Sequence, residues 1–183
     1  YSKLNCVGER EVLPEGKFGQ YHWLNYKQFY EKVYSFSQGL AKVGLKPGDK
    51  IGVYGPNCIF WQTTAFAAHM NTMSIVPVYD SLGPGAAHYI ITHAECKCVV
   101  CHQTKIDSLL SILKDCPDLK YVIAIDAQAP TLNVDSVKSY TCEDIVKIGQ
   151  EGEDVELKDP VPDDDALIMY TSGSTGKPKG CVM

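Results

Sequence analysis

The sequence predicts an α/β fold with a mainly parallel sheet, because short apolar runs alternate with amphipathic helical segments along most of the chain. Its 183 residues are enough to bury a full core as one domain. The composition, 45% hydrophobic and 21% charged, is that of an ordinary globular protein. Regular alternation of strands and helices is typical of a parallel sheet that is covered by helices.

The clearest element is a helix predicted from Asn25 to Val43. Its apolar residues recur at helical spacing and would form one buried face: Phe29, Val33, Phe36, Leu40 and Val43. Asn25 and Gln28 have the spacing of an N-terminal capping box. Gly44 is expected to end the helix, because glycine adopts the left-handed conformation found at helix C-termini.

The next elements continue the alternation. A strand is expected at residues 50–54, and a second helix that Asn57 caps runs to about Met70. Residues 74–78 form the second strand, and Pro77 favours an edge position or a strand end because it lacks an N–H donor. The pattern then predicts helix 85–93, strand 96–101, helix 105–114 and strand 120–125.

The alternation is interrupted between residues 127 and 161, where only a short helix at 141–148 is expected. Residues 151–165 hold eight acidic residues and one lysine, leaving 16 basic and 14 acidic residues for the rest of the chain. The net charge of −5 therefore reflects one acidic segment. A last buried strand is predicted from Asp165 to Tyr170.

The strongest functional signal follows that strand, where Tyr170 to Gly180 reads Y-T-S-G-S-T-G-K-P-K-G. Its three glycines let the backbone approach an anion closely, and its hydroxyl groups and two lysines add donors and positive charge. Successive N–H groups in such a loop can form an anion-binding nest. Because a strand delivers the loop at the carboxyl edge of a sheet, we predict a phosphate-binding loop.

Two better-known motifs do not fit this segment. A Walker A loop needs a glycine where Thr171 stands, and a Ser or Thr where Pro178 stands. The nucleophile elbow G-x-S-x-G fails because neither Ser172 nor Ser174 is flanked by the required glycines. A plain surface turn would need neither the paired lysines nor a preceding buried strand.

The segment resembles the phosphate loop of the adenylate-forming (acyl-activating) enzymes, which include acyl-CoA synthetases, luciferases and peptide-synthetase adenylation domains. A second stretch, V-P-V-Y-D-S-L-G-P-G at 76–85 with Y-I-I-T-H-A-E at 89–95, is similar to long-chain fatty-acid–CoA ligases of eukaryotic type. The resemblance extends from about Trp23 to Met183. The phosphate loop indicates the superfamily, and the second stretch indicates the subfamily.

This resemblance implies that residues 1–183 are the N-terminal part of the large AMP-binding domain, ending just after the phosphate loop, with the C-terminal domain absent. The complete enzyme would use ATP, Mg²⁺ and a fatty acid to form an acyl-adenylate and pyrophosphate, and CoA would then displace AMP. The fragment alone would be inactive, because most catalytic residues lie downstream. The alternatives are an acetyl-CoA synthetase, a peptide-synthetase adenylation domain, or a nucleotide-binding module without catalysis.

By the same resemblance, the β- and γ-phosphates of ATP are expected at the middle of the loop: Ser172, Gly173, Ser174, Thr175 and Gly176. Lys179 would be catalytic, because its charge stabilises the departing pyrophosphate. Lys177 occupies a variable position and is expected to be a solvated charge. Thr171 would join the nucleotide site and ligate Mg²⁺ through its hydroxyl. Tyr79 and Asp80 would lie near the acyl site, with simple packing as the alternative.

A cluster of cysteines matches two metal-binding patterns: Cys96, Cys98, Cys101 and His102. C-x-x-C-H is the haem-attachment pattern, and the four residues could be counted as zinc ligands. On a strand from residue 96, however, Cys96 and Cys98 would share one face and Cys101 would point to the other. Core packing without metal is therefore predicted, since free cysteine behaves as a small hydrophobe. The five histidines show no metal-type spacing.

The sequence gives only general expectations about binding partners and cellular location. No basic stripe with interleaved aromatic residues points to nucleic acid. The first ten residues do not resemble a signal peptide, so an intracellular location is expected. By resemblance, the complete enzyme could associate peripherally with the endoplasmic reticulum, the mitochondrial outer membrane or the peroxisome.

One aromatic set is expected to pack against the first helix rather than line an acyl tunnel: Trp23, Tyr26, Phe29, Tyr30, Tyr34 and Phe36.

Overall fold

A five-stranded parallel sheet forms the centre of the molecule in the computed structural model, which describes residues 1–83, 85–125, 128–132, 134–172 and 176–183. All neighbouring strands of this sheet are parallel. Their spatial order is β4 (Ser74–Val78), β3 (Lys50–Tyr54), β5 (Cys98–His102), β6 (Tyr121–Ile125) and β7 (Lys138–Thr141). The predicted fold class is therefore confirmed, and β4 stands at the edge of this sheet, as Pro77 suggested.

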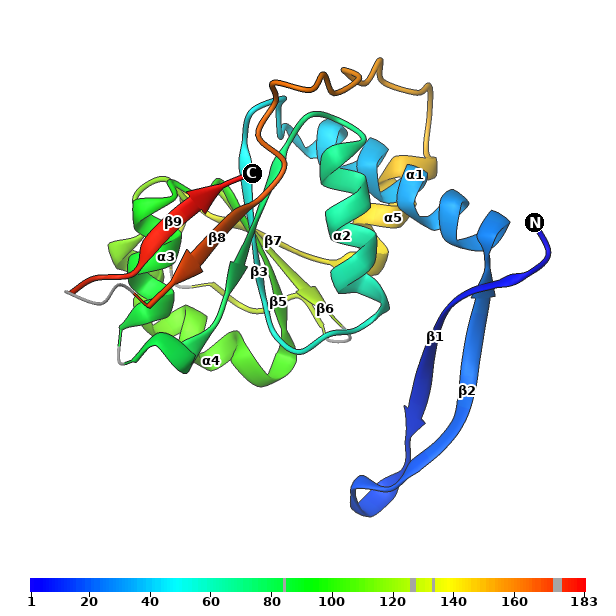
Figure 1. The fold of residues 1–183 in the computed structure, drawn as a ribbon, viewed down its shortest axis with the longest axis horizontal. Coiled ribbons are helices and arrows are strands. Elements are labelled where there is room, and N and C mark those ends of the chain that lie inside the picture. The colour runs from blue at the N-terminus through cyan, green and yellow to red at the C-terminus, as the bar shows by residue number, and fades with distance from the viewer. Residues whose placement is uncertain (84, 126–127, 133, 173–175) are drawn as a thin grey trace.

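Helices cover both faces of the sheet (Figure 1). One face packs against α1 (Tyr26–Val43), α2 (Ile59–His69) and α5 (Cys142–Gln150), and the other against α3 (Ala86–His93) and α4 (Gln103–Ile112). Along β5, Cys98 and Val100 enter the first layer, whereas Val99 and Cys101 enter the second. Burial on both faces explains why these strands are continuous apolar runs in the sequence.

The ends of α1 are those predicted, whereas the predicted start of α2 is wrong by one residue. Asn25 Oδ1 accepts a hydrogen bond from the Gln28 amide at 2.9 Å, and Gln28 Oε1 accepts one from the Asn25 amide at 3.0 Å. Gly44 ends the helix with a φ of 113°. The cap position of α2 belongs to Cys58, whose extended backbone places its carbonyl 3.1 Å from the Trp61 amide.

Two glycines allow α1 and α5 to pack in close backbone contact. A Cβ atom at Gly39 would lie 2.0 Å from the carbonyl oxygen of Ile145, and one at Gly149 would lie 1.7 Å from that of Ser35. The Lys42 ammonium donates to the Gly149 carbonyl at 3.0 Å, which satisfies part of the C-terminal end of α5. This helix pair therefore fixes where the chain leaves α5.

An antiparallel hairpin that the sequence did not predict, β1 (Asn5–Val12) and β2 (Phe18–Asn25), projects from the body (Figure 1). Several of its apolar side chains are exposed: Val12, Phe18, Tyr21 and Trp23. The predicted packing of the aromatic set is confirmed for Phe29 and Phe36. It is wrong for Trp23, Tyr26 and Tyr30, because the hairpin extends away from the helix and the tyrosines face outward. In the described part of the chain, no helix has the length and apolar character needed to cross a membrane.

We expect Gly39→Ala to lower the free energy of unfolding by about 1–3 kcal/mol, because the added methyl group must push α5 away from α1. Urea-induced unfolding of the purified chain measures this change. Glu31→Ala, on the exposed face of the same helix, serves as the control and should change stability by less than about 0.5 kcal/mol. Equal effects of the two substitutions would contradict the close contact.

Candidate functional site

The predicted phosphate loop joins two strands of an antiparallel hairpin, β8 (Ile168–Thr171) and β9 (Lys179–Val182). The chain reaches β8 beside the sheet edge, where Leu167 forms a parallel bridge with Ile75 of β4. The Ile75 amide donates to the Ala166 carbonyl at 3.0 Å. The loop therefore starts at the carboxyl end of a strand that runs alongside β4, as expected. β8 begins at Ile168 rather than at Asp165, although Leu167 already exchanges hydrogen bonds with Met183.

The structure places Thr171 and Lys179 directly opposite each other across the hairpin. Directly opposed residues of an antiparallel pair project to the same face, so the hydroxyl and the ammonium share one side. Both residues are exposed, as are Ser172 and Gly176 at the two ends of the loop. Gly176 has a φ of 150°, a conformation that other residues rarely adopt. Gly173, Ser174 and Thr175 lie outside the described residues.

The two lysines of the motif have different surroundings. Lys179 lies on β9 rather than in the loop, and it makes no ion pair with the described residues. Lys177 is exposed, but its Nζ lies 5.5 Å from the centre of the Tyr89 ring. This distance is within the range of a cation–π contact. The expectation that Lys177 is a purely solvated charge is therefore incomplete.

Tyr170, the last buried residue before the loop, contacts Tyr79 at the end of β4. The Tyr79 hydroxyl donates to the Tyr170 carbonyl, and burial raises the pKa of Tyr79 above its ordinary value. Burial also raises the pKa of Tyr170 to about 12, so its phenol is neutral at physiological pH. The contact favours a packing role for Tyr79. The side chain of Asp80 lies outside the described part of the structure.

The acidic segment at 151–165 is held against the body by buried polar side chains. The Gln38 amide group donates to the Val155 carbonyl at 2.9 Å and accepts from the Val155 amide at 2.7 Å. Thr72 Oγ1 donates to the Lys158 carbonyl at 2.7 Å, and Ser74 Oγ donates to the Asp165 carbonyl at 2.7 Å. These bonds fix the path of the chain between α5 and β8, where it has no helix or strand.

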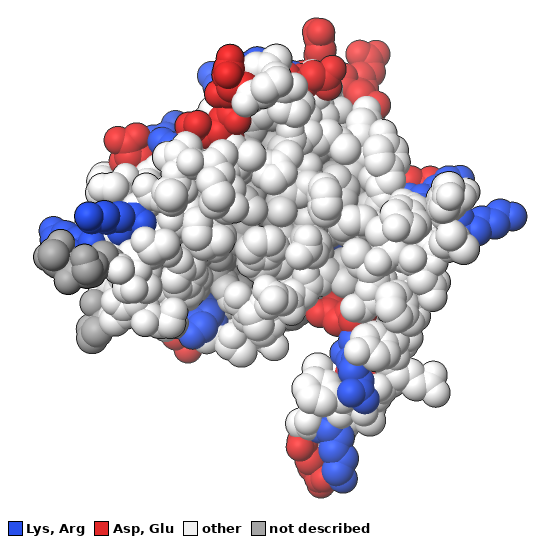
Figure 2. All heavy atoms as spheres, in the orientation of Figure 1, with Lys and Arg blue, Asp and Glu red and all other residues white. Residues whose placement is uncertain are grey.

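The charges of this region are separated along the chain. Acidic side chains gather over the segment between α5 and β8, and basic ones gather at the tip of the β8–β9 hairpin (Figure 2). Lys177 and Lys179 are the basic residues that follow the loop. The local field at the hairpin tip therefore favours an anion.

The cysteine cluster is part of the core, although its predicted geometry is partly wrong. Cys96, Cys98 and Cys101 are fully buried. β5 begins at Cys98 rather than at residue 96, because Glu95 turns the chain with a φ of 56°. Cys96 therefore packs on the same side as Cys101, and Cys98 packs on the other. Across the described ranges, no three His, Cys, Asp or Glu side chains are grouped to hold a metal.

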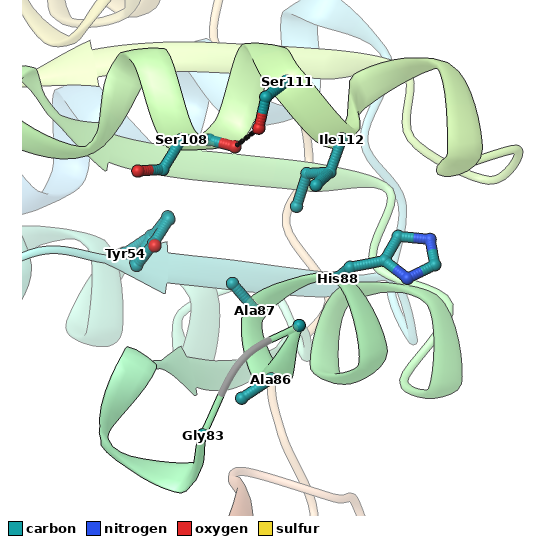
Figure 3. Close-up of a pocket in the computed structure, with 9 residues that line it drawn as sticks. Tyr54, Gly83, Ala86, Ala87, His88, Ser108, Ser111 and Ile112 are labelled. Carbon is teal, nitrogen blue, oxygen red and sulfur yellow. Dashed lines mark hydrogen bonds between the residues drawn. The ribbon is translucent and has the colours of Figure 1, made fainter.

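A pocket of about 380 Å³ lies between α3 and α4, and Tyr54, Ala86, Ala87 and Ser108 are among the residues that line it (Figure 3). His88 points away from Tyr54, and its Nε2 lies 3.1 Å from the Asp115 carbonyl oxygen. The lining contains no lysine, arginine, aspartate or glutamate among the described residues. This pocket therefore offers less for binding a phosphate than the hairpin tip.

Sequence reasoning missed the residues that hold the acidic segment and those that contact the hairpin. The first group is Gln38, Thr72 and Ser74, and the second is Tyr89 and His93. A signal was available for the first three, since each is a polar residue in or beside a predicted buried element. For Tyr89 and His93 the four-residue spacing on one helix face was available, but their partner comes from a distant strand.

Comparisons with known proteins agree on one family. The sequence profile described as AMP-binding enzyme matches residues 5–183. The chain is 35% identical to long chain acyl-CoA synthetase 5 of Arabidopsis thaliana, covering 100% of this chain and 28% of that protein. It is 32% identical to fatty acyl-CoA synthetase B of Dictyostelium discoideum, with the same coverage of 100% and 28%. The chain thus spans less than a third of the length of these relatives.

Solved structures show the same fold at lower identity. The adenylation domain of a carboxylate reductase from Mycobacterium chelonae superposes with a TM-score of 0.79 at 15% identity, covering 96% of this chain and 30% of that one. A red-emitting luciferase from Phrixothrix hirtus gives a TM-score of 0.71 at 22% identity, covering 88% and 39%. These likenesses support the fold and carry no statement about substrate.

We expect Cys181 to be alkylated much faster than the buried cysteines. Cys181 is exposed, whereas burial raises the pKa of Cys96 and of Cys101 to about 12. At pH 8 these two thiols are almost entirely protonated and shielded, so they should react at least about a hundredfold more slowly. Mass spectrometry after timed iodoacetamide treatment measures the rates. Cys181→Ser is the control that removes the fast phase, and rapid labelling of Cys96 would contradict the core assignment.

Proposed function

The chain belongs to the AMP-binding enzyme family, and on that premise we propose that it is the N-terminal part of a long-chain fatty-acid–CoA ligase. The complete protein would convert a fatty acid and ATP to acyl-adenylate and pyrophosphate, and CoA would then displace AMP. The observation that carries this proposal is the similarity over the whole chain to relatives named long chain acyl-CoA synthetases. In the complete protein, the region that corresponds to the remaining length of those relatives would supply the adenine site and a C-terminal catalytic lysine.

The geometry of the hairpin supports a role in binding the phosphates of ATP. Thr171 and Lys179 face each other at the base of the loop, and the Ser172 side chain is exposed beside them. In the proposal, backbone N–H groups and hydroxyls of residues 172–176 hold the β- and γ-phosphates. Lys179 adds a positive charge on the same face. The fatty-acid carboxylate attacks the α-phosphorus, and the bond between the α-phosphorus and the oxygen that bridges to the β-phosphate breaks. Negative charge then develops on the departing pyrophosphate.

A magnesium ion fits this site as a companion of the phosphates. Mg²⁺ is bound in proteins by a few oxygen ligands together with phosphate groups and water. The exposed Thr171 hydroxyl at the end of β8 can supply one such oxygen. The ion would neutralise phosphate charge, while Lys179 and the loop orient the leaving group.

The substrate class is tested by pyrophosphate exchange with the complete protein. Palmitate is expected to support ATP–pyrophosphate exchange at least about tenfold better than acetate or an amino acid. With CoA present, the same acid should yield the acyl thioester. Preference for acetate or for an amino acid would move the protein to another branch of the family. Absence of exchange with every acid would favour a nucleotide-binding protein without catalysis.

We expect Lys179→Ala in the complete protein to slow acyl-adenylate formation about a hundredfold, or on the order of 3 kcal/mol, with a smaller loss of ATP affinity. The reason is that Lys179 would stabilise charge that appears only as pyrophosphate leaves. The thioester step from preformed acyl-adenylate should be nearly unchanged. Pyrophosphate release and thioester formation, measured separately, distinguish the two steps.

Lys177→Ala is the matched control within the same motif. Its ammonium is exposed and contacts Tyr89, so its removal should cost only about 0–1 kcal/mol. Equal losses for the two lysines would mean that the catalytic role is assigned to the wrong residue. Equal losses in both half-reactions would mean that the loop acts only through the fold.

A further inference from the structure

The backbone enters the phosphate loop through a residue that is fixed at both ends. Tyr170 is 2% exposed, whereas Thr171 and Ser172 are exposed. The Tyr170 carbonyl accepts a hydrogen bond from the Tyr79 hydroxyl. The Tyr170 hydroxyl lies 2.7 Å from Nδ1 of His93 on α3. One residue is thus held by its main chain and by the tip of its side chain, immediately before the loop.

The contact with Tyr79 lies just beyond a gap in the main-chain hydrogen bonds between β4 and β8. Ile75 donates its amide to Ala166, which sets the register between β4 and the start of β8. In a parallel ladder the next donor from β4 comes two residues later, at position 77. That residue is proline and has no amide hydrogen. Beyond this gap, the Tyr79 side chain supplies the donor that reaches β8.

Burial keeps the Tyr170 hydroxyl neutral where it contacts His93. Because burial raises the pKa of Tyr170 to about 12, the phenol keeps its proton. A neutral hydroxyl 2.7 Å from Nδ1 of His93 forms a hydrogen bond with that nitrogen. The Tyr170 ring also meets the His93 ring edge to face, with centres 5.8 Å apart. Packing and hydrogen bonding therefore fix the same side chain.

Tyr89 extends this group to the other side of the loop. Its ring stacks on His93, with centres 5.0 Å apart, and meets the Tyr170 ring edge to face at 6.2 Å. Lys177, which follows the loop, places its Nζ 5.5 Å from the same Tyr89 ring. A Cβ atom at Gly180 would lie 3.1 Å from the Tyr170 ring, so the glycine lets β9 pass close to it. The rings therefore contact the chain on both sides of the loop.

We propose that His93 and Tyr79 are positioning residues of the phosphate loop, which hold Tyr170 so that Thr171 and Ser172 leave β8 in one fixed orientation. This inference rests on the proposed function, because the loop is taken to bind the pyrophosphate part of ATP. In this proposal both residues act through Tyr170. Their effect is confined to the adenylation step, since donors displaced by about 1 Å lose much of their effect on a transition state.

The first test measures the two half-reactions in variants of the complete protein. His93→Phe keeps a ring against Tyr89 and removes Nδ1, and we expect it to lower kcat for adenylation about tenfold with a less than threefold change in KM for ATP. Tyr170→Phe should have a similar effect, and the double variant should be no slower than either single one. His93→Asn, whose amide can occupy the place of Nδ1, should recover to within about threefold of wild type.

Controls separate positioning from general destabilisation. His88→Phe makes the same change on the same helix, where the ring faces Asp115, and should leave adenylation unchanged. The thioester step from preformed acyl-adenylate should stay within about twofold of wild type in every variant. Equal losses in both half-reactions, no recovery in His93→Asn, or a normal rate in both His93→Phe and Tyr170→Phe would overturn the proposal.

A second readout does not depend on activity, so it separates this inference from the proposed function. Hydrogen–deuterium exchange should show faster exchange of the amides of Thr171, Ser172, Gly176 and Lys177 in His93→Phe, by about fivefold or more, with recovery in His93→Asn. Amides of β3 should be unchanged. If the wild type fails to adenylate any acid, the proposed function fails while this measurement still decides whether His93 orders the loop. Unchanged exchange, or a uniform increase along the chain, would overturn the inference.

Discussion

The N–H and C=O groups of a strand that is covered by helices on both faces can form hydrogen bonds only with neighbouring strands. On the outer side of β4, one residue in the position of a donor is a proline. The Ile75 amide bonds to Ala166, so the chain that leads to β8 runs beside β4. Pro77 then interrupts the ladder. β8 also pairs with β9, and the turn between these two strands is the phosphate-loop motif. The candidate site thus begins just beyond the point where main-chain bonding to β4 is interrupted.

The sheet and its helices could be predicted because their residues are buried in a regular pattern. The apolar spacing of α1 and the continuous apolar runs of β3 and β6 are direct consequences of burial. The β1–β2 hairpin could not be found in this way, because its strands project from the body and have no buried face with a clear period. β7 was missed because only four residues pair at its edge of the sheet. Cys96 was misplaced because the turn at Glu95 has no local sequence signal.

In the candidate site, too, some features could be predicted from the sequence and others could not. The composition of the motif indicated a phosphate loop, and its position after β8 agrees with that prediction. The opposition of Thr171 and Lys179 could not be derived, since it depends on the return of the chain as β9. The contact of His93 with Tyr170 joins residues 77 positions apart, and neither residue alone indicates a partner. Local composition therefore identified the chemistry, whereas the supporting contacts required the three-dimensional arrangement.

The side chains that secure the acidic segment bind its main chain. Gln38, Thr72, Ser74 and His69 all contact backbone atoms between Val155 and Ala166. The carboxylates of the segment take little part in these contacts. Its acidic side chains can therefore change without loss of these bonds, whereas replacement of Gln38 or Thr72 removes a hydrogen bond to the main chain of the segment. A relative could keep the geometry of the loop while losing the acidic character of the segment before it.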